Sequence, residues 1–214
     1  MTASEISSRP FDAVLCDLDN VIRFYDLAPL AGKERAAGLA EGTTARVAYA
    51  PEIDLPLLLG RITKEEWVDA IASALSAVSD RMPRARAREL GAALADAPFR
   101  ADDTVVSLLR RVRAHMPLVL VTNATLELER DLASMRLADL ADHVVSSARV
   151  GTAKPGREIY EIAAERAGVP AGRCLFVDDR PENVETAAML GMTGLCYREP
   201  ADLQRMLGFL PAPG

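Results

Sequence analysis

The sequence predicts an α/β protein, with a Rossmann-like parallel sheet core that has helices on both faces and a small all-helical cap domain. From residue 97 onward, short apolar runs alternate with helical patterns, which indicates βαβ units and a parallel sheet. A similar apolar run opens the chain at residues 13–16. Between them, residues 22–96 show helical periodicity and no strand signal. We therefore expect a core of residues 1–21 and 97–214 and a cap of 22–96.

Composition limits the classes of function. The chain has 214 residues, of which 50% are hydrophobic and 26% charged, as in an ordinary soluble globular protein. Its formal charge of −6 argues against a general affinity for nucleic acid or an anionic membrane, but not against a small anionic substrate. We expect a monomer or a dimer.

The expected compartment is the cytoplasm. Met1 to Pro10 lack an apolar signal segment, and no apolar run approaches a membrane-spanning length. Cys16, Cys174 and Cys196 lie in or beside apolar runs, so we expect free thiols in a reducing compartment and no disulfides.

The first strand and the cap helices follow from local patterns. Ala13 to Cys16 is an apolar run typical of a buried strand, and it ends at two carboxylates. Thr63 and Glu66 fit a capping box, which predicts that a helix begins there. Its expected inward face is Trp67, Ile71, Ala74, Leu75 and Val78. A second helix is expected over 84–96, with Leu90, Ala93, Leu94 and Ala97 inward.

The second part of the chain predicts four more strands. They are expected at Leu118 to Val121, His143 to Val145, Cys174 to Val177, and near Leu195 to Tyr197. Asp102 or Asp103 can cap a helix before the first of them, and another helix is expected at about 125–136.

Three of these strands end at polar clusters: Asp17 and Asp19, Thr122 and Asn123, and Asp178 and Asp179. Because the carboxyl ends of parallel strands meet at one edge, we expect the clusters to converge there, together with Lys154. Several carboxylates in one place repel each other unless a cation is present. Carboxylate oxygens, with phosphate and water, suit Mg²⁺. The lysine and the hydroxyl would then hold the remaining phosphate oxygens.

These motifs resemble the haloacid dehalogenase superfamily, specifically its phosphatases with a helical cap inserted after the first motif. The resemblance covers nearly the whole chain. It rests on Asp17-Leu18-Asp19-Asn20-Val21, Val121-Thr122-Asn123, Lys154-Pro155, and Val177-Asp178-Asp179 with Glu182-Asn183, in the family's order. Each motif alone is short, but four in order at strand ends form a specific pattern.

The resemblance implies a role for each catalytic residue. Asp17 would be the nucleophile that forms an aspartyl-phosphate. Asp19 would protonate the leaving alkoxide and then act as base toward water. Thr122 would donate to a phosphoryl oxygen, and Lys154 would neutralise charge on the phosphate and on Asp17.

The resemblance also implies the metal ligands. Mg²⁺ would be bound by the Asp17 carboxylate, the Asp19 backbone carbonyl and Asp179, with Asp178 supporting Asp179 or a bound water. The family's dehalogenases lack a carboxylic acid at the position of Asp19, because their leaving halide needs no proton. Asp19 therefore favours phosphate chemistry over dehalogenation.

Further candidates lie around these motifs. Asn20 stands where many relatives carry glycine; if the turn needs a positive φ, Asn tolerates it, and its amide can also face the pocket. Asn123, Arg23 and Arg61 are candidate phosphate or substrate contacts. For Arg23 and Arg61, a solvated surface arginine is the alternative. Asn183 is expected either to order the turn of the fourth motif by bonding backbone or to cap a helix.

The expected function is Mg²⁺-dependent hydrolysis of a small phosphorylated metabolite, a phosphate monoester, with a sugar phosphate as the leading substrate. The cap would close over the substrate and reopen. A phosphotransferase of the phosphoglucomutase type shares every motif and is the nearest alternative. A non-catalytic phosphate-binding or partner-binding module is the third, although the complete set of motif residues argues against it.

Overall fold

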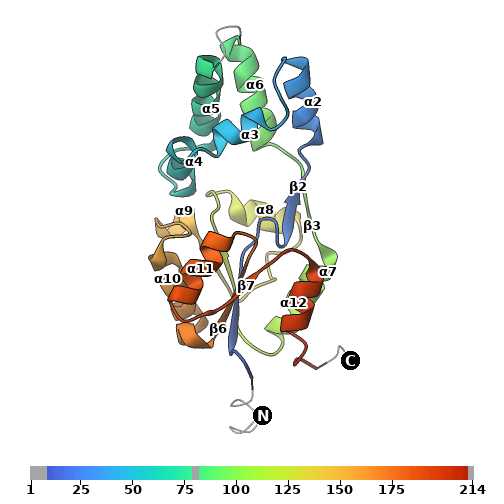
Figure 1. The fold of residues 1–214 in the computed structure, drawn as a ribbon, viewed down its shortest axis with the longest axis vertical. Helices are drawn as coiled ribbons and strands as arrows, with labels where there is room; N and C mark the ends of the chain where they lie inside the picture. The colour runs from blue at the N-terminus through green and yellow to red at the C-terminus, as the bar shows by residue number, and fades with distance from the viewer. Residues whose placement is uncertain (1–8, 79–81, 212–214) are drawn as a thin grey trace. The chain divides into compact units, whose positions relative to one another are not determined.

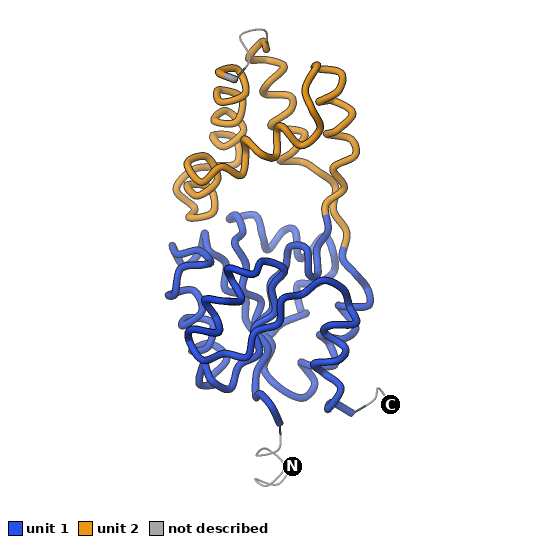
Figure 2. Tube along the Cα trace, in the orientation of Figure 1, with its two compact units in different colours: residues 1–24, 101–214 blue, residues 25–100 orange. Residues whose placement is uncertain are grey.

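The computed structural model describes residues 9–78 and 82–211, without the side chain of Val78, and the chain divides into two compact units. Unit 1 contains the chain up to Phe24 and from Ala101 onward, and unit 2 contains Tyr25–Arg100 (Figure 2). Residues 1–8, where no signal segment is expected, lie outside the described part. No helix in the described part is long and apolar enough to cross a membrane.

Unit 1 is built on a five-stranded sheet in the order β5-β4-β1-β6-β7, and every neighbouring pair is parallel. The strands are β1 (Ala13–Cys16), β4 (Leu118–Thr122), β5 (His143–Ser146), β6 (Cys174–Asp178) and β7 (Thr193–Cys196). Cys16, the last residue of β1, lies level with Leu120 and Val177, so the three central strands end within two residues of one another. β1 is the third of the five strands, so it lies in the middle of the sheet. The residues that follow β1 therefore lie at the centre of the carboxyl edge.

Helices cover both faces of this sheet, as Figure 1 shows. Val14 and Cys16 pack in one buried cluster with residues of α7 and α12, whereas Ala13 and Leu15 pack in another with residues of α10 and α11. The helical segments of unit 1 are α7 (Asp103–Arg113), α8 (Leu128–Ser134), α9 (Ser147–Val150), α10 (Arg157–Ala167), η1 (Ala171–Arg173), α11 (Pro181–Met189) and α12 (Pro200–Met206). Burial on both faces explains why the strands are continuous apolar runs rather than alternating patterns. The predicted α/β fold is confirmed.

Unit 2 is a bundle of short helices around its own core. They are α2 (Ala28–Ala36), α3 (Thr43–Ala48), α4 (Pro51–Leu58), α5 (Lys64–Val78) and α6 (Arg84–Ala95). The capping box is confirmed, because Thr63 Oγ1 accepts from Glu66 N at 3.2 Å and Glu66 Oε2 accepts from Thr63 N at 2.7 Å. Gly91 lets α6 approach α5 closely, since a Cβ there would stand 3.2 Å from the carbonyl oxygen of Val68.

The inward faces of α5 and α6 are largely as expected. Trp67, Ile71 and Leu75 of α5 and Leu90 and Leu94 of α6 are buried. Ala97, just after α6, is buried as well, whereas Ala74 and Ala93 are half-buried. The side chain of Val78 lies outside the described part.

The expectation of an all-helical stretch over 22–96 is wrong at its beginning. Residues Arg23–Tyr25 form a strand, β2, which pairs with β3 (Phe99–Ala101) in a two-stranded sheet. Each strand has only three residues, too few to give a periodic pattern, and the pairing joins segments about 75 positions apart in the sequence. The aromatic rings of Tyr25 and Phe99 meet edge to face at 5.5 Å, a contact typical of paired strands.

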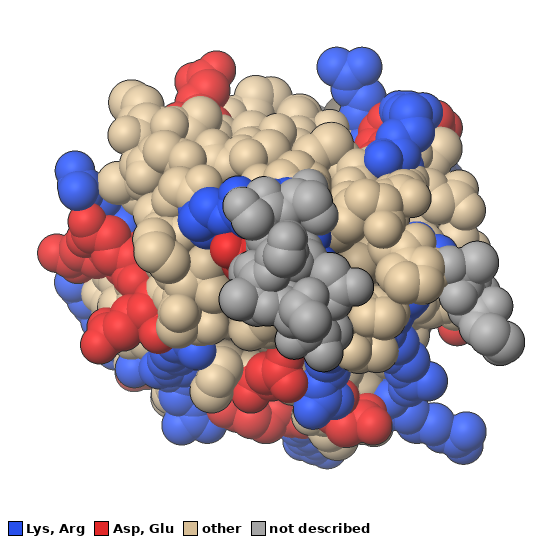
Figure 3. Space-filling model, turned by 90° about the horizontal axis from the view of Figure 1, so that it is seen from below, with Lys and Arg blue, Asp and Glu red and all other residues tan. Residues whose placement is uncertain are grey.

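The surface carries both signs of charge. Figure 3 shows one face on which Lys and Arg side chains lie among Asp and Glu side chains. Elsewhere in the described part, ion pairs join charged side chains, such as Arg173 with Asp12 at 2.8 Å and Arg113 with Asp142 at 3.0 Å. An interleaved arrangement of this kind agrees with the modest net negative charge of the whole chain.

Candidate active site

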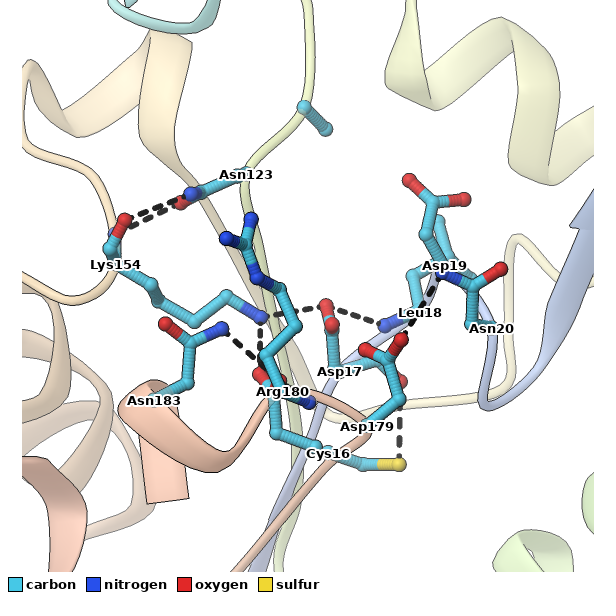
Figure 4. Close-up of polar contacts among 12 residues, drawn as sticks. Cys16, Asp17, Leu18, Asp19, Asn20, Asn123, Lys154, Asp179, Arg180 and Asn183 are labelled. Carbon is cyan, nitrogen blue, oxygen red and sulfur yellow. Dashed lines mark hydrogen bonds and ion pairs between the residues drawn. The ribbon is translucent and has the colours of Figure 1, made fainter. Parts of the chain in front are cut away.

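The polar clusters predicted at the strand ends meet in unit 1. Asp17 follows β1, Thr122 ends β4, Asp178 ends β6, and Lys154 comes from the segment before α10. All four side chains are buried, with exposures between 0% and 6%. Figure 4 shows the side chain of Lys154 extending toward Asp17. The parallel order of the sheet therefore brings together groups that are up to 161 positions apart.

Lys154 is the central cation of this cluster. Its Nζ lies 2.6 Å from Asp17 Oδ1 and 2.6 Å from Asp178 Oδ2. Burial alone would lower the pKa of Lys154, but the two carboxylates outweigh burial and raise that pKa. Asn123 fixes the backbone of Lys154, because its Nδ2 donates to Lys154 O at 2.9 Å and its Oδ1 accepts from Lys154 N at 2.8 Å. The lysine is thus held from both ends.

Asp17 is a buried carboxylate whose surroundings disfavour its charged form. Burial raises its pKa to about 7, with a further increase from Asp178 and an opposing effect from Lys154. Its Oδ1 also accepts a hydrogen bond from the backbone N–H of Leu18 at 2.8 Å. A carboxylate that is costly to ionise is a typical feature of functional sites.

The two aspartates after β6 differ in their surroundings. Asp178 is fully buried, and besides Lys154 it accepts from Asn183 Nδ2 at 2.9 Å and from Arg180 N at 2.9 Å. Asp179 is more open and accepts from Asn20 Nδ2 at 3.1 Å. Burial, followed by the charge of Asp178, raises the pKa of Asp179. Asn183 thus orders this turn through a carboxylate, which differs from the expected bond to backbone.

The acidic cluster fits a divalent cation. Asp17, Asp178 and Asp179 each offer one oxygen, and these oxygens lie within 4.8 Å of one another. Among the described residues, Lys154 pairs with two of these three carboxylates, Asp17 and Asp178, so the cluster has more acidic groups than paired cations and a metal ion would balance them. Oxygen donors alone suit a hard ion such as Mg²⁺ rather than a thiolate-binding metal.

Thr122, at the end of β4, carries a buried hydroxyl group that is not engaged by the described residues. Its side chain is 1% exposed, and Oγ1 has no hydrogen-bond partner among the described residues. A buried hydroxyl without a partner is costly and uncommon in native proteins, and such a group calls for an explanation. At the carboxyl end of β4, next in sequence to Asn123, this hydroxyl is suited to donate to an anion.

The loop after Asp17 makes a tight turn. Asn20 has φ 59°, which confirms the positive φ considered from the sequence, and its N–H donates to Arg23 O at 2.9 Å. Asp19 points its carboxylate at the guanidinium of Arg23, with Nε–Oδ1 at 2.6 Å and Nη2–Oδ2 at 3.0 Å. The same guanidinium donates through Nη1 to Asp131 Oδ2 at 2.8 Å. Sequence reasoning missed Asp131, since nothing local marks a partner 108 positions away.

Arg61 belongs to the other compact unit, unit 2. It lies in the turn between α4 and α5, and its side chain is exposed. Its expected contact with substrate therefore stays a prediction. The three cysteines are free thiols, with Cys16 and Cys174 buried and Cys196 half-buried, as expected.

Comparisons with known proteins identify the family of the chain. A family model described as haloacid dehalogenase-like hydrolase matches residues 11–191. A sesquiterpene phosphatase from Aspergillus oryzae is 35% identical over 99 residues, which are 45% of this chain and 50% of that protein. A phosphatase from Mycobacterium tuberculosis is 43% identical over 75 residues, 35% of each chain. The match thus spans half or less of the length of these curated relatives.

Solved structures share the fold over a longer stretch. A wild-type enzyme of this family from Bacteroides thetaiotaomicron, in complex with magnesium and inorganic phosphate, superposes with a TM-score of 0.65 at 18% identity. The superposition covers 88% of this chain and 94% of that one. Because the family model matches well over half of the chain, the chain belongs to the haloacid dehalogenase-like hydrolase family.

Proposed function

We propose that this chain hydrolyses a small organic phosphate monoester in a magnesium-dependent reaction that passes through an aspartyl-phosphate on Asp17. One observation carries the proposal. A buried carboxylate, Asp17, lies 2.6 Å from a buried ammonium group, Lys154, and the buried hydroxyl of Thr122 has no hydrogen-bond partner among the residues that the structure describes. This arrangement supplies a nucleophile together with a cation and a donor for the oxygens of a transferring phosphoryl group.

Asp17 attacks phosphorus, so that a bond forms between its carboxylate oxygen and phosphorus while the bond from phosphorus to the leaving oxygen breaks. Asp19 gives its proton to the leaving alkoxide, which departs as an alcohol. Asp19 then takes a proton from the water that attacks the aspartyl-phosphate, and inorganic phosphate is released with Asp17 restored. Covalent catalysis divides one difficult displacement into two easier steps.

Lys154 and Thr122 stabilise the phosphoryl group in both steps. The ammonium group of Lys154 neutralises charge on Asp17 and on the phosphoryl oxygens, and the hydroxyl of Thr122 donates to one of those oxygens. Asn123 keeps Lys154 in place through its two backbone hydrogen bonds. Because these donors are fixed before substrate binds, little reorganisation is needed during the reaction.

Mg²⁺ would be held by the Asp17 carboxylate, the Asp19 backbone carbonyl and Asp179, with Asp178 in a supporting position. When bound, it would neutralise negative charge on the phosphate and on the nucleophile. The open Asp179 fits the direct ligand, since Asp178 already engages Lys154, Asn183 and Arg180.

Unit 2 serves as a cap that selects the leaving group, closes over bound substrate and reopens. In this proposal a sugar phosphate is the leading substrate class, and Arg61 and Asn20 are candidate contacts. The curated relatives are named as phosphatases, which supports hydrolysis of phosphate monoesters but not one particular leaving group.

The test is phosphate release from a panel of monoesters that includes sugar phosphates, nucleotides, an alkyl phosphate and p-nitrophenyl phosphate. Wild type, Asp17→Asn and the control Asp12→Asn, which alters an aspartate in a surface ion pair, are compared with Mg²⁺ and with excess chelator. We expect Mg²⁺-dependent release that only Asp17→Asn abolishes. Folded wild type that releases phosphate from no compound, or Asp17→Asn that remains active, would contradict the proposal.

A further inference from the structure

Arg23 contacts Asp19, the residue proposed above as the general acid and base. Its guanidinium forms two parallel hydrogen bonds to Asp19, at 2.6 Å and 3.0 Å, and a third bond to Asp131 at 2.8 Å. The side chain of Arg23 is 4% exposed, against 31% for Asp19 and 28% for Asp131. All three residues belong to unit 1, so the network lies within one compact body.

The two hydrogen bonds from Arg23 fix the orientation of the Asp19 carboxylate as well as its distance from the guanidinium. The planar guanidinium matches the plane of a carboxylate, so it restricts the rotation of the Asp19 side chain as well as its position. Lysine cannot do the same, because an ammonium group is a single point charge on a flexible stem. The turn is also fixed by backbone bonds, since Arg23 N donates to Leu18 O at 2.8 Å and Arg23 O accepts from Asn20 N at 2.9 Å.

Asp131 anchors the arginine from the opposite side. It lies on α8, whose Leu128 and Leu132 are 1% and 3% exposed and pack in the same core cluster as β1. The anchor is therefore attached to a packed helix rather than to a loose surface segment. It follows that the guanidinium is held between two carboxylates, one on the motif loop and one on the core.

We propose that Arg23 and Asp131 are positioning residues that set the orientation of the Asp19 carboxylate for proton transfer. The inference rests on the proposed function, in which Asp19 is the acid and base. It assigns Arg23 a role different from phosphate binding, because all three guanidinium nitrogens already donate to carboxylates.

The leaving group provides a specific test of proton transfer. An alkyl phosphate needs a proton on its departing alkoxide, whereas p-nitrophenyl phosphate releases a stable anion without one. Since kcat/KM reports the steps up to formation of the aspartyl-phosphate, a misplaced Asp19 should lower kcat/KM for the alkyl ester and spare the nitrophenyl ester. A general structural defect, or a lost phosphate contact, should lower both equally.

The variants are Asp131→Asn and Arg23→Lys, with Asp131→Glu as the conservative rescue. Glu129→Gln is the matched control, because Glu129 also lies on α8 but pairs with the exposed Arg149. Each is assayed with Mg²⁺, after thermal unfolding has identified the variants that fold. We expect Asp131→Asn and Arg23→Lys to lower kcat/KM for the alkyl ester roughly 10-fold or more, with less than about a 2-fold change for the nitrophenyl ester. Asp131→Glu should recover part of the loss.

Equal losses on both esters, no loss on either, or the same loss in Glu129→Gln would overturn the inference. Failure of the proposed function has a separate signature, since wild type would then release phosphate from neither ester. If one variant does not fold, the other still decides the outcome, because Arg23→Lys changes the group that contacts Asp19 and Asp131→Asn changes only the group that anchors Arg23.

Discussion

Replacement of Lys154 by methionine is the sharpest perturbation of the site's electrostatics. Methionine keeps most of the length of the side chain but removes the ammonium group that lies 2.6 Å from both Asp17 and Asp178. These carboxylates are 8% and 0% exposed, so water cannot replace the lost cation. We expect the free energy of unfolding to fall by about 3–5 kcal/mol, as is typical when one partner of a buried ion pair is removed.

Two further variants separate this effect from a general loss of charge. Arg157→Met removes a cation from the exposed pair with Glu161 and should cost less than about 1 kcal/mol. The double variant Lys154→Met/Asp178→Asn should recover part of the loss, because one of the two unpaired negative charges is removed. All proteins are measured by urea unfolding with far-ultraviolet circular dichroism, with a chelator present.

The pH dependence of this penalty has a definite sign. The pKa of Asp17 is raised in the folded protein, chiefly by burial, so the folded state binds more protons than the unfolded state between pH 3.8 and about 7. Lys154 opposes that increase, so its removal should raise the pKa further. The penalty should therefore be smaller at pH about 5.5 than at pH about 8. A loss no larger than that of Arg157→Met, or a penalty that grows as pH falls, would refute the reasoning.

Three other predictions concern separate parts of the chain. Asn20→Ala should lower the free energy of unfolding by about 1–2 kcal/mol and Asn20→Gly by less, because φ is 59°; equal losses in urea unfolding would contradict this. Thr63→Ala should cost about 1 kcal/mol in unit 2, read from the fluorescence of Trp67, and an unshifted transition would contradict the capping box. Asp12→Asn should cost about 0.5–1 kcal/mol at neutral pH, because the hydrogen bond from Arg173 lowers the pKa of Asp12. That difference in thermal unfolding should vanish as pH falls well below 3.8, and a pH-independent difference would be evidence against the ion pair.

The strands of the sheet could be predicted because their signal is local. Ala13–Cys16 is apolar throughout and is buried on both faces, so composition alone fixes its position and its end at Asp17. The convergence of Asp17, Thr122 and Asp178 then follows from parallel topology. Where the signal is not local, the prediction fails, as for the three-residue strand Arg23–Tyr25, whose partner lies about 75 positions away.

In the site too, the residue types could be predicted from local sequence, whereas their side-chain partners could not. Residue types and their order at strand ends indicated Lys154 and the carboxylates, but not that Lys154 bridges Asp17 and Asp178. Neither the two backbone bonds of Asn123 to Lys154 nor the bond of Asn183 to Asp178 has a sequence signature. Side-chain partners depend on rotamers and on distances set by the whole fold, which periodicity and spacing do not encode.

The most direct test of the central claim is to locate the phosphoryl group during turnover. A single turnover with Mg²⁺ and the most active monoester is stopped by rapid acid quench, and the peptide that contains Asp17 is examined by mass spectrometry. We expect a transient phosphoryl adduct on Asp17 that forms before free phosphate appears and is absent in Asp17→Asn. Phosphate release with no adduct at any time, or an adduct on another residue, would contradict it.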